Sequence, residues 1–337
     1  MISNPQTTIM HSHNLLLLLL FLFFFTCSFA ELCNPDDKKV LLNIKKAFNN
    51  PYILTSWKPE EDCCTWYCVE CDKKSHRIIA LTIFADDKLK GQIPPSVGDL
   101  PFLENLMFHK LPNLVGPIPP TIAKLHKLKY LDLSWNGLSG SIPSFLDSLS
   151  DLDYLDLSFN RLTGSIPSSL ANLRHLGTLH LDRNKLTGPI PDSFGNFKGK
   201  IPYLYLSHNQ LSGKIPASMG GVDFNYIDLS RNKLEGDASV LFGAKKTTEI
   251  INLSRNLLEF DMSKVVFPPT LTWLDLNHNK IFGEIPMGVV KLELQMLNVS
   301  YNALCGRIPV GGKLQSFDAY SYFHNKCLCG KPLGSCK

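Results

Sequence analysis

The sequence predicts an α/β solenoid, a right-handed superhelix of about ten turns of 24 residues with a parallel sheet on its concave face and a disulfide-bonded cap at each end. A Leu-x-Leu core recurs from Leu81 to Leu297 in nine steps, at a mean period of 24 residues. An Asn and a Gly-x-Ile-Pro element follow most of these cores at fixed spacing. Cysteine is absent between Cys71 and Cys305. A period and consensus of this kind define a leucine-rich repeat.

Residues 1–30 are predicted to be a secretory signal peptide. Residues 15–25 form an unbroken apolar run that is too short to cross a bilayer. Ser28 and Ala30 place small residues at −3 and −1, which favours cleavage after Ala30 over the alternative of an uncleaved anchor. Since no later apolar stretch has the length of a membrane span, we expect a secreted product that is not membrane-embedded.

The composition is that of a folded protein, with 44% hydrophobic and 19% charged residues. The formal net charge of +4 is small and dispersed along the chain, which argues against a nucleic-acid partner.

Residues 31–76 are predicted to form an N-terminal cap. Its first part has a helical apolar face made by Val40, Leu41, Ile44, Ala47 and Phe48. Its second part carries an aromatic cluster, which we interpret as cap core rather than a ligand site: Trp57, Trp66 and Tyr67.

Nine cysteines remain in the mature chain, five near its start and four near its end. This distribution is typical of disulfide-stapled caps in an oxidising compartment. Cys68-x-x-Cys71 could also belong to a zinc site, but a second such pair is missing, so we expect neither metal nor cofactor. Because five is odd, one early cysteine is free or pairs outside the chain.

Residues 77–310 are predicted to form the repeat array, and residues 311–337 a C-terminal cap. In each repeat a short strand points its leucines inward, as with Leu131 and Leu133, and the residue between them outward. The Asn after each strand is expected to pair backbone groups at the turn. Two units replace Gly-x-Ile-Pro, near Gly236 and Glu259, and there we expect a bulge or a longer convex loop.

The sequence contains no Gly-x-Ser-x-Gly, His-Glu-x-x-His or P-loop motif, so no catalytic residue is assigned. Four aspartates share one outward strand position, and we interpret them as a solvated acidic stripe rather than a glycosidase site: Asp132, Asp156, Asp228 and Asp275.

The concave face instead has the residue types of a protein-binding surface, with aromatic and Arg side chains in rows. The predicted contact residues are Tyr130, Asp132, Tyr154, Asp156, His180, Arg183, Tyr205, His208, Asp228, Arg231, Arg255 and His278. Two N-glycosylation sequons begin at Asn252 and Asn298, also on outward strand positions.

The chain resembles plant polygalacturonase-inhibiting proteins over essentially its whole mature length. The most specific matching segments lie in the caps, at residues 33–42 (CNPDDKKVLL), 62–69 (DCCTWYCV) and 312–330 (GKLQSFDAYSYFHNKCLCG). A repeat segment at residues 91–101 (GQIPPSVGDLP) matches as well.

The resemblance implies a secreted defence protein of the plant cell wall and apoplast, not an enzyme, that binds microbial endopolygalacturonases through its concave face and limits pectin degradation. Cell-wall pectin is a second candidate partner, and we expect a monomer. The resemblance also implies four disulfides, with Cys68 left over: Cys33–Cys63, Cys64–Cys71, Cys305–Cys327 and Cys329–Cys336. In a mildly acidic wall the concave histidines are expected to gain charge.

Two alternatives use the same fold. A receptor-like ligand-binding ectodomain is disfavoured by the missing membrane span. A developmental or ice-binding relative is the other, and a flat, regular Thr or Asn face would favour ice binding, whereas the outward columns here mix Tyr, Asp, His and Arg.

Overall fold

The computed structural model describes residues 32–197 and 203–336, of which those from Cys33 onward belong to one compact unit. The predicted signal peptide, residues 1–30, lies outside the described residues.

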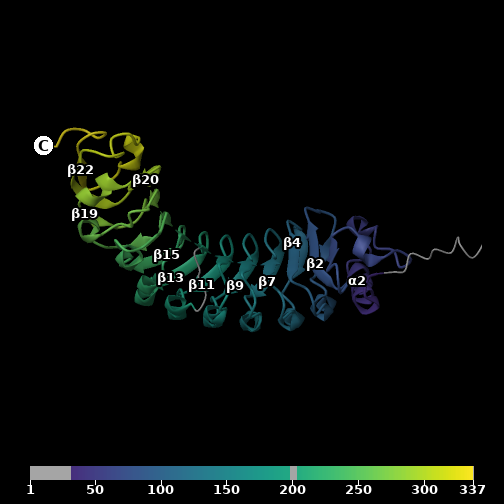
Figure 1. The fold of residues 1–337 in the computed structure, drawn as a ribbon. Helices are drawn as coiled ribbons and strands as arrows, with labels where there is room; N and C mark the ends of the chain where they lie inside the picture. Colours follow the sequence, from purple (N-terminus) through teal and green to yellow (C-terminus); the bar gives the residue numbers. More distant parts are fainter. Residues whose placement is uncertain (1–31, 198–202, 337) are drawn as a thin grey trace, which may run out of the picture. The chain divides into compact units, whose positions relative to one another are not determined.

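The main sheet has eleven strands, ten of them parallel and stacked in sequence order (Figure 1). β1 (Val69–Cys71) pairs antiparallel with β2 (Ile78–Phe84) and comes from the N-terminal cap. The remaining strands are β4 (Asn105–His109), β6 (Tyr130–Asp132), β8 (Tyr154–Asp156), β10 (Thr178–His180), β12 (Tyr203–Tyr205), β14 (Tyr226–Asp228), β16 (Ile250–Asn252), β18 (Trp273–Asp275) and β20 (Met296–Asn298). The predicted parallel array of ten repeats is therefore confirmed.

The structure also contains a second set of parallel strands, which was not predicted. Its eight-stranded sheet consists of β3 (Lys90–Gly91), β5 (Asn113–Gly116), β7 (Gly137–Ser141), β9 (Arg161–Gly164), β11 (Lys185–Gly188), β13 (Gln210–Lys214), β15 (Lys233–Gly236) and β17 (Leu257–Leu258). A three-stranded sheet continues with β19 (Phe282–Gly283), β21 (Ala303–Arg307) and β22 (Cys327–Cys329). The break between them falls at the units that lack Gly-x-Ile-Pro.

Each turn returns through a short 3₁₀ helix. Most of these helices follow the Pro of the Gly-x-Ile-Pro element, whose fixed φ suits the residue before a helix. They are η3 (Pro95–Asp99), η4 (Pro120–Lys124), η5 (Ser144–Ser148), η6 (Ser168–Asn172), η7 (Asp192–Asn196), η8 (Ala217–Gly221), η9 (Ser239–Leu241), η10 (Met262–Lys264) and η11 (Met287–Lys291). Leucine and isoleucine side chains from the strands and these helices fill the interior.

The N-terminal cap contains α2 (Pro35–Ala47), η1 (Tyr52–Leu54) and η2 (Cys63–Thr65). Asn34 caps α2 by accepting hydrogen bonds from two backbone amides of its first turn. Leu41, Ile44 and Phe48 are buried as predicted, but Val40 is half-buried and Ala47 is exposed.

The aromatic cluster of this cap is a stacked pair rather than a trio. Trp57 and Trp66 are buried, with ring centroids 5.6 Å apart. The prediction for Tyr67 was wrong, because its ring is 53% exposed while its carbonyl accepts from Nε1 of Trp57.

The C-terminal cap contains an eleventh turn that continues the main ladder. The amides of Val299 and Tyr301 donate to the carbonyls of Ser321 and Phe323 at 2.8 and 2.9 Å. Tyr322 takes the buried leucine position of this turn, which follows η12 (Ala319–Ser321). The eleventh turn is thus a repeat in which a tyrosine replaces one core leucine.

Candidate functional site

A ladder of buried asparagines fixes the turn after each strand of the main sheet. Asn160 shows the pattern: its Nδ2 donates to the carbonyl of Leu133 in the preceding turn at 2.8 Å, and its Oδ1 accepts from the amide of Leu138 at 3.0 Å. The same bonds recur to the last turn, where Asn325 contacts Val299 and Leu304. The predicted structural role of these asparagines agrees with this geometry.

The residue before each of these asparagines has a left-handed backbone, with φ between 51° and 59°. We call these residues the left-handed row: Trp135, Phe159, Arg183, His208, Arg231, Arg255, His278, Tyr301 and His324. Their side chains stand along one border of the open face of the main sheet, the face predicted to be concave. Trp135 stacks on Phe159 at 3.6 Å, and the Arg183 guanidinium lies 4.9 Å from the Phe159 ring.

A second line of side chains crosses the centre of the open face as a tyrosine ladder: Tyr130, Tyr154, His180, Tyr205 and Tyr226. Successive ring centroids are 4.3, 5.8, 3.9 and 4.4 Å apart, and three of the four pairs are stacked. The parallel register brings these rings together, since Tyr130 lies beside Tyr154 and His180 beside Tyr205. Burial is the main cause that raises the pKa of Tyr205 to about 12, so its phenol is a neutral hydrogen-bonding group.

The prediction of a solvated acidic stripe was wrong for Asp132 and Asp156, whereas Asp228 and Asp275 are half-buried. Asp132 and Asp156 are only 5% and 8% exposed. The Oδ1 of each accepts a hydrogen bond from the backbone amide two residues later, as Asp156 does from Ser158 at 2.8 Å. This is an Asx turn, and the Asp-x-Ser spacing in the sequence was the signal for it.

Burial also shifts the acidity of three carboxyls of the stripe, those of Asp156, Asp228 and Asp275. It is the main cause that raises the pKa of Asp156, Asp228 and Asp275, and the hydrogen bonds from Ser158, Ser230 and Asn277 oppose it. Asp132 and Asp156 therefore support the tyrosine ladder and have little surface to offer a partner.

The arginines make the charged part of the open face. Arg183, Arg231 and Arg255 are exposed, and no ion pair within the described residues involves them. They border a polar hollow of about 420 Å³, whose floor includes Asp228 and Asp275. We call it the arginine hollow.

Two histidines of the left-handed row, His208 and His278, differ from the expectation that they gain charge in mild acid. Burial first, and then neighbouring arginines, lower the pKa of both His208 and His278. These rings resist protonation, because a second cation beside Arg231 or Arg255 is unfavourable. His180, in the tyrosine ladder, lies with its Nδ1 3.6 Å from Asp182.

The two sequons differ in their surroundings. Asn252 lies between β14 and β18 and lines the arginine hollow. Asn298 lies on β20, the last strand of the main sheet. Each accepts hydrogen bonds from the Ser of its own sequon, in the Asx turn that the aspartates also make.

The chain resembles known families and proteins over most of its length. The model of the leucine rich repeat N-terminal domain matches residues 34–72, and leucine rich repeat models match residues 126–186, 150–211, 201–222 and 270–292. The polygalacturonase inhibitor of Pyrus communis is 72% identical over 92% of this chain and 94% of its own. That of Vitis vinifera is 70% identical over 92% and 93%. The chain belongs to the polygalacturonase inhibitor family.

The family resemblance predicted from the sequence is thus confirmed, and membership in a family of inhibitors agrees with the prediction that the protein is not an enzyme. Among solved structures, a plant ice-binding protein superimposes with a TM-score of 0.89 at 54% identity, covering 90% of this chain and 98% of that one. Among the residues that the structure describes, no helix is long and apolar enough to span a bilayer.

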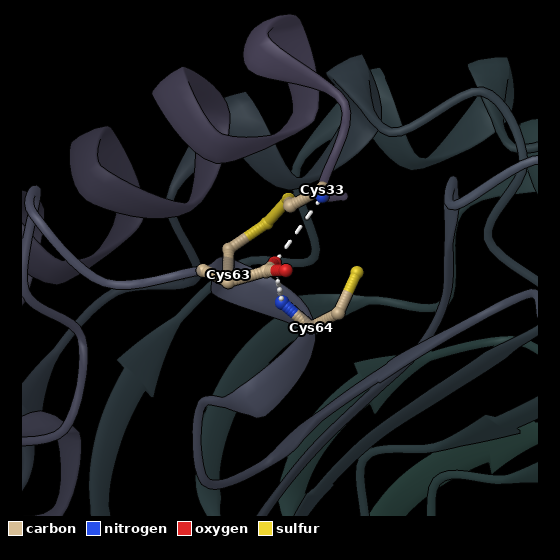
Figure 2. A group of neighbouring side chains, drawn as sticks. Cys33, Cys63 and Cys64 are labelled. Atoms are coloured by element: carbon tan, nitrogen blue, oxygen red, sulfur yellow. Dashed lines mark hydrogen bonds between the residues drawn. A yellow bond between two sulfur atoms is a disulfide. The ribbon is translucent and has the colours of Figure 1, made fainter. Parts of the chain in front are cut away.

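In this polygalacturonase inhibitor family member, the described cysteines form four disulfides: Cys33–Cys63, Cys64–Cys71, Cys305–Cys327 and Cys329–Cys336. Cys33, Cys63 and Cys64 lie close together (Figure 2). A carboxylate oxygen of Asp62 lies within 4.8 Å of their sulfurs. Their sulfurs are bonded in disulfides, so this group does not have the free thiolates of a metal site.

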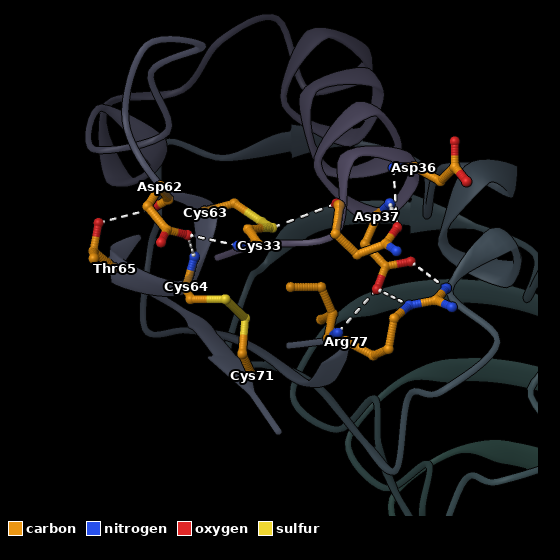
Figure 3. The surroundings of a disulfide bond; sticks show 11 residues. Cys33, Asp36, Asp37, Asp62, Cys63, Cys64, Thr65, Cys71 and Arg77 are labelled. Atoms are coloured by element: carbon orange, nitrogen blue, oxygen red, sulfur yellow. Dashed lines mark hydrogen bonds and ion pairs between the residues drawn. A yellow bond between two sulfur atoms is a disulfide. The ribbon is translucent and has the colours of Figure 1, made fainter. Parts of the chain in front are cut away.

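Asp62 instead ties the two disulfides of the N-terminal cap together. Its Oδ1 accepts from the amides of Cys33 at 3.2 Å and Cys64 at 2.9 Å (Figure 3). In addition, Arg77 makes a bidentate ion pair with Asp37 at 2.7 and 2.8 Å, which joins α2 to the start of β2 (Figure 3). Cys68 remains a free thiol.

Proposed function

We propose that this protein is secreted to the plant cell wall, binds microbial endopolygalacturonases through the open face of its main sheet, and limits pectin degradation. The observation that carries the proposal is the identity of 72% and 70% to curated polygalacturonase inhibitors along more than nine tenths of both chains. The open face adds the physical support.

The tyrosine ladder suits a protein partner better than a sugar chain. Sugars bind to open aromatic faces, but in stacked pairs such as Tyr130 with Tyr154 and His180 with Tyr205 each ring covers a face of the other. The ladder therefore presents ring edges and hydroxyl groups. Tyr and Arg together are the residue types that most often anchor protein interfaces.

The left-handed row supplies the charge complementarity. Arg183, Arg231 and Arg255 have no carboxylate partner within the described residues and can meet acidic groups of a docked enzyme. A polygalacturonase must keep its cleft open to a polyanionic substrate, so a rigid face docked at the cleft rim blocks access sterically.

The proposed contacts are the predicted set without its two most buried carboxylates: Tyr130, Tyr154, His180, Arg183, Tyr205, His208, Asp228, Arg231, Arg255 and His278. Asp132 and Asp156 are excluded, since they are almost fully buried beneath the ladder. The row of arginines also suits de-esterified pectin, which would then compete with the enzyme for the same face.

The test compares two faces of the solenoid. Arg231→Ala and Tyr205→Ser should weaken binding to an inhibited polygalacturonase by about 30-fold, the effect of losing a central anchor of ~2 kcal/mol. Lys214→Ala, on β13 of the second sheet, is the control and should change nothing. If Lys214→Ala loses inhibition while the other two variants inhibit fully, the interface lies on the second sheet and not on the open face. Adding de-esterified pectin tests the competition.

A further inference from the structure

The open face does not end with the last regular repeat but continues into the C-terminal cap. There, a second hollow of about 300 Å³ is lined by residues that follow β16 and β18, by residues of β20 and the turn after it, and by residues of the eleventh turn. We call it the aromatic hollow, and its rings are His278, Tyr301, Tyr320, Phe323 and His324.

Three aromatic rings of the aromatic hollow are exposed to solvent. Tyr320 is 73% exposed, Tyr301 45% and Phe323 37%. Burying such rings against a partner releases apolar surface from water, and clustered exposed aromatics mark interaction sites.

The hollow is rigid before anything binds. Tyr301 is stacked between His278 and His324, with ring centroids 4.1 and 4.2 Å away. Tyr320 meets Phe323 edge-to-face at 5.1 Å, and Asp318 caps the short helix that carries Tyr320. A preorganised site loses little side-chain entropy on binding.

The chemistry of the lining favours an apolar side chain over a charged or sugar ligand. Of the described residues that line the hollow, Arg255 has the one permanent charge. Both faces of the Tyr301 ring are covered, so that ring cannot stack on a sugar. The volume of about 300 Å³ lies at the low end of ligand pockets, of the size for one large side chain.

The two hollows adjoin, because Arg255 and Asn277 line both of them. A partner that docks on the arginine hollow therefore lies next to the aromatic hollow. From this continuity, we infer that an apolar side chain on the surface of the bound polygalacturonase inserts into the aromatic hollow and makes Tyr320 and Phe323 a second anchor that helps decide which enzymes bind. The inference rests on the proposed function and adds a contact in the C-terminal cap.

The experiment measures dissociation constants for a panel of fungal endopolygalacturonases. The double variant Tyr320→Ala/Phe323→Ala should bind at least tenfold more weakly to enzymes that the parent protein binds. The matched control is Tyr52→Ala, which removes a tyrosine that is 87% exposed on the N-terminal cap. Single Tyr320→Ala, measured alongside, should retain the parent melting temperature, because its ring is mostly in solvent.

The outcomes separate the two proposals. If the parent binds no member of the panel, the proposed function fails, and this inference fails with it. If the parent binds and the double variant binds equally well, the inference alone is overturned. It is also overturned if the double variant loses only affinity for galacturonan oligomers, or if peptide mapping by mass spectrometry shows a glycan on Asn298, since a sugar would then be the occupant.

Discussion

Replacing Asn209 by alanine tests the asparagine ladder directly beneath the candidate site. Two of its hydrogen bonds cross to the preceding turn: Nδ2 donates to the carbonyl of Leu181 at 2.9 Å, and Oδ1 accepts from the amide of Leu186 at 3.0 Å. Both backbone groups are buried, and alanine leaves both without this partner. A buried unpaired polar group costs ~1–3 kcal/mol, so the free energy of unfolding should fall by about 2–6 kcal/mol.

The measurement is urea unfolding followed by circular dichroism, with the disulfides kept oxidised. Asn113→Ala is the matched control: the Asn113 side chain is exposed and donates to the carbonyl of Asp87 at 2.7 Å, so its loss should cost about 1 kcal/mol or less. Equal effects of the two substitutions would refute the argument that buried pairing by the ladder holds the turns.

Two further predictions concern acidity. Burial raises the pKa of Asp228, so the folded state binds this proton more tightly than the unfolded chain and loses stability as the pH rises through the folded pKa. Asp228→Asn, which imitates Asn252 in the next strand, should therefore melt at a higher temperature than the parent near pH 7 and approach it near about pH 4; parallel melting curves would contradict this. Burial also raises the pKa of the Cys68 thiol to about 12, so iodoacetamide should label it only after unfolding, and rapid labelling of the folded protein would show the thiol to be accessible.

The sequence predicted best those features whose residue pattern lies within one repeat. The leucine period places the ten parallel strands, because each Leu-x-Leu core marks one strand. The same period places the asparagines and the left-handed row that precedes them. Positions such as Arg231 and His278 could thus be assigned to one border of the sheet without a structure.

The features that the sequence did not predict depend on contacts between repeats or on positions where the consensus residue is replaced. Asp156 is buried between the neighbouring strands, where it lies beside Asp132 and His180, and a single repeat does not reveal that packing. The eleventh turn was not predicted, because the buried Tyr322 stands where the other turns have a core leucine. The second sheet consists of strands of two to five residues, most of which contain Gly and show little alternation, so its sequence pattern is weak.

The left-handed row separates the choice of side chain from the stability of the solenoid. A positive φ costs a residue other than glycine roughly 1–3 kcal/mol, whichever unbranched side chain it carries, and the flanking ladder bonds hold that backbone in place. In the described turns with Asn ladder residues, the row contains Trp, Phe, Arg, His and Tyr but no Val, Ile or Thr, the residues that tolerate this conformation least. The side chains of the row can therefore be exchanged at positions spaced about 4.8 Å apart from turn to turn. Substitutions there could change which enzymes the inhibitor binds without a redesign of its core.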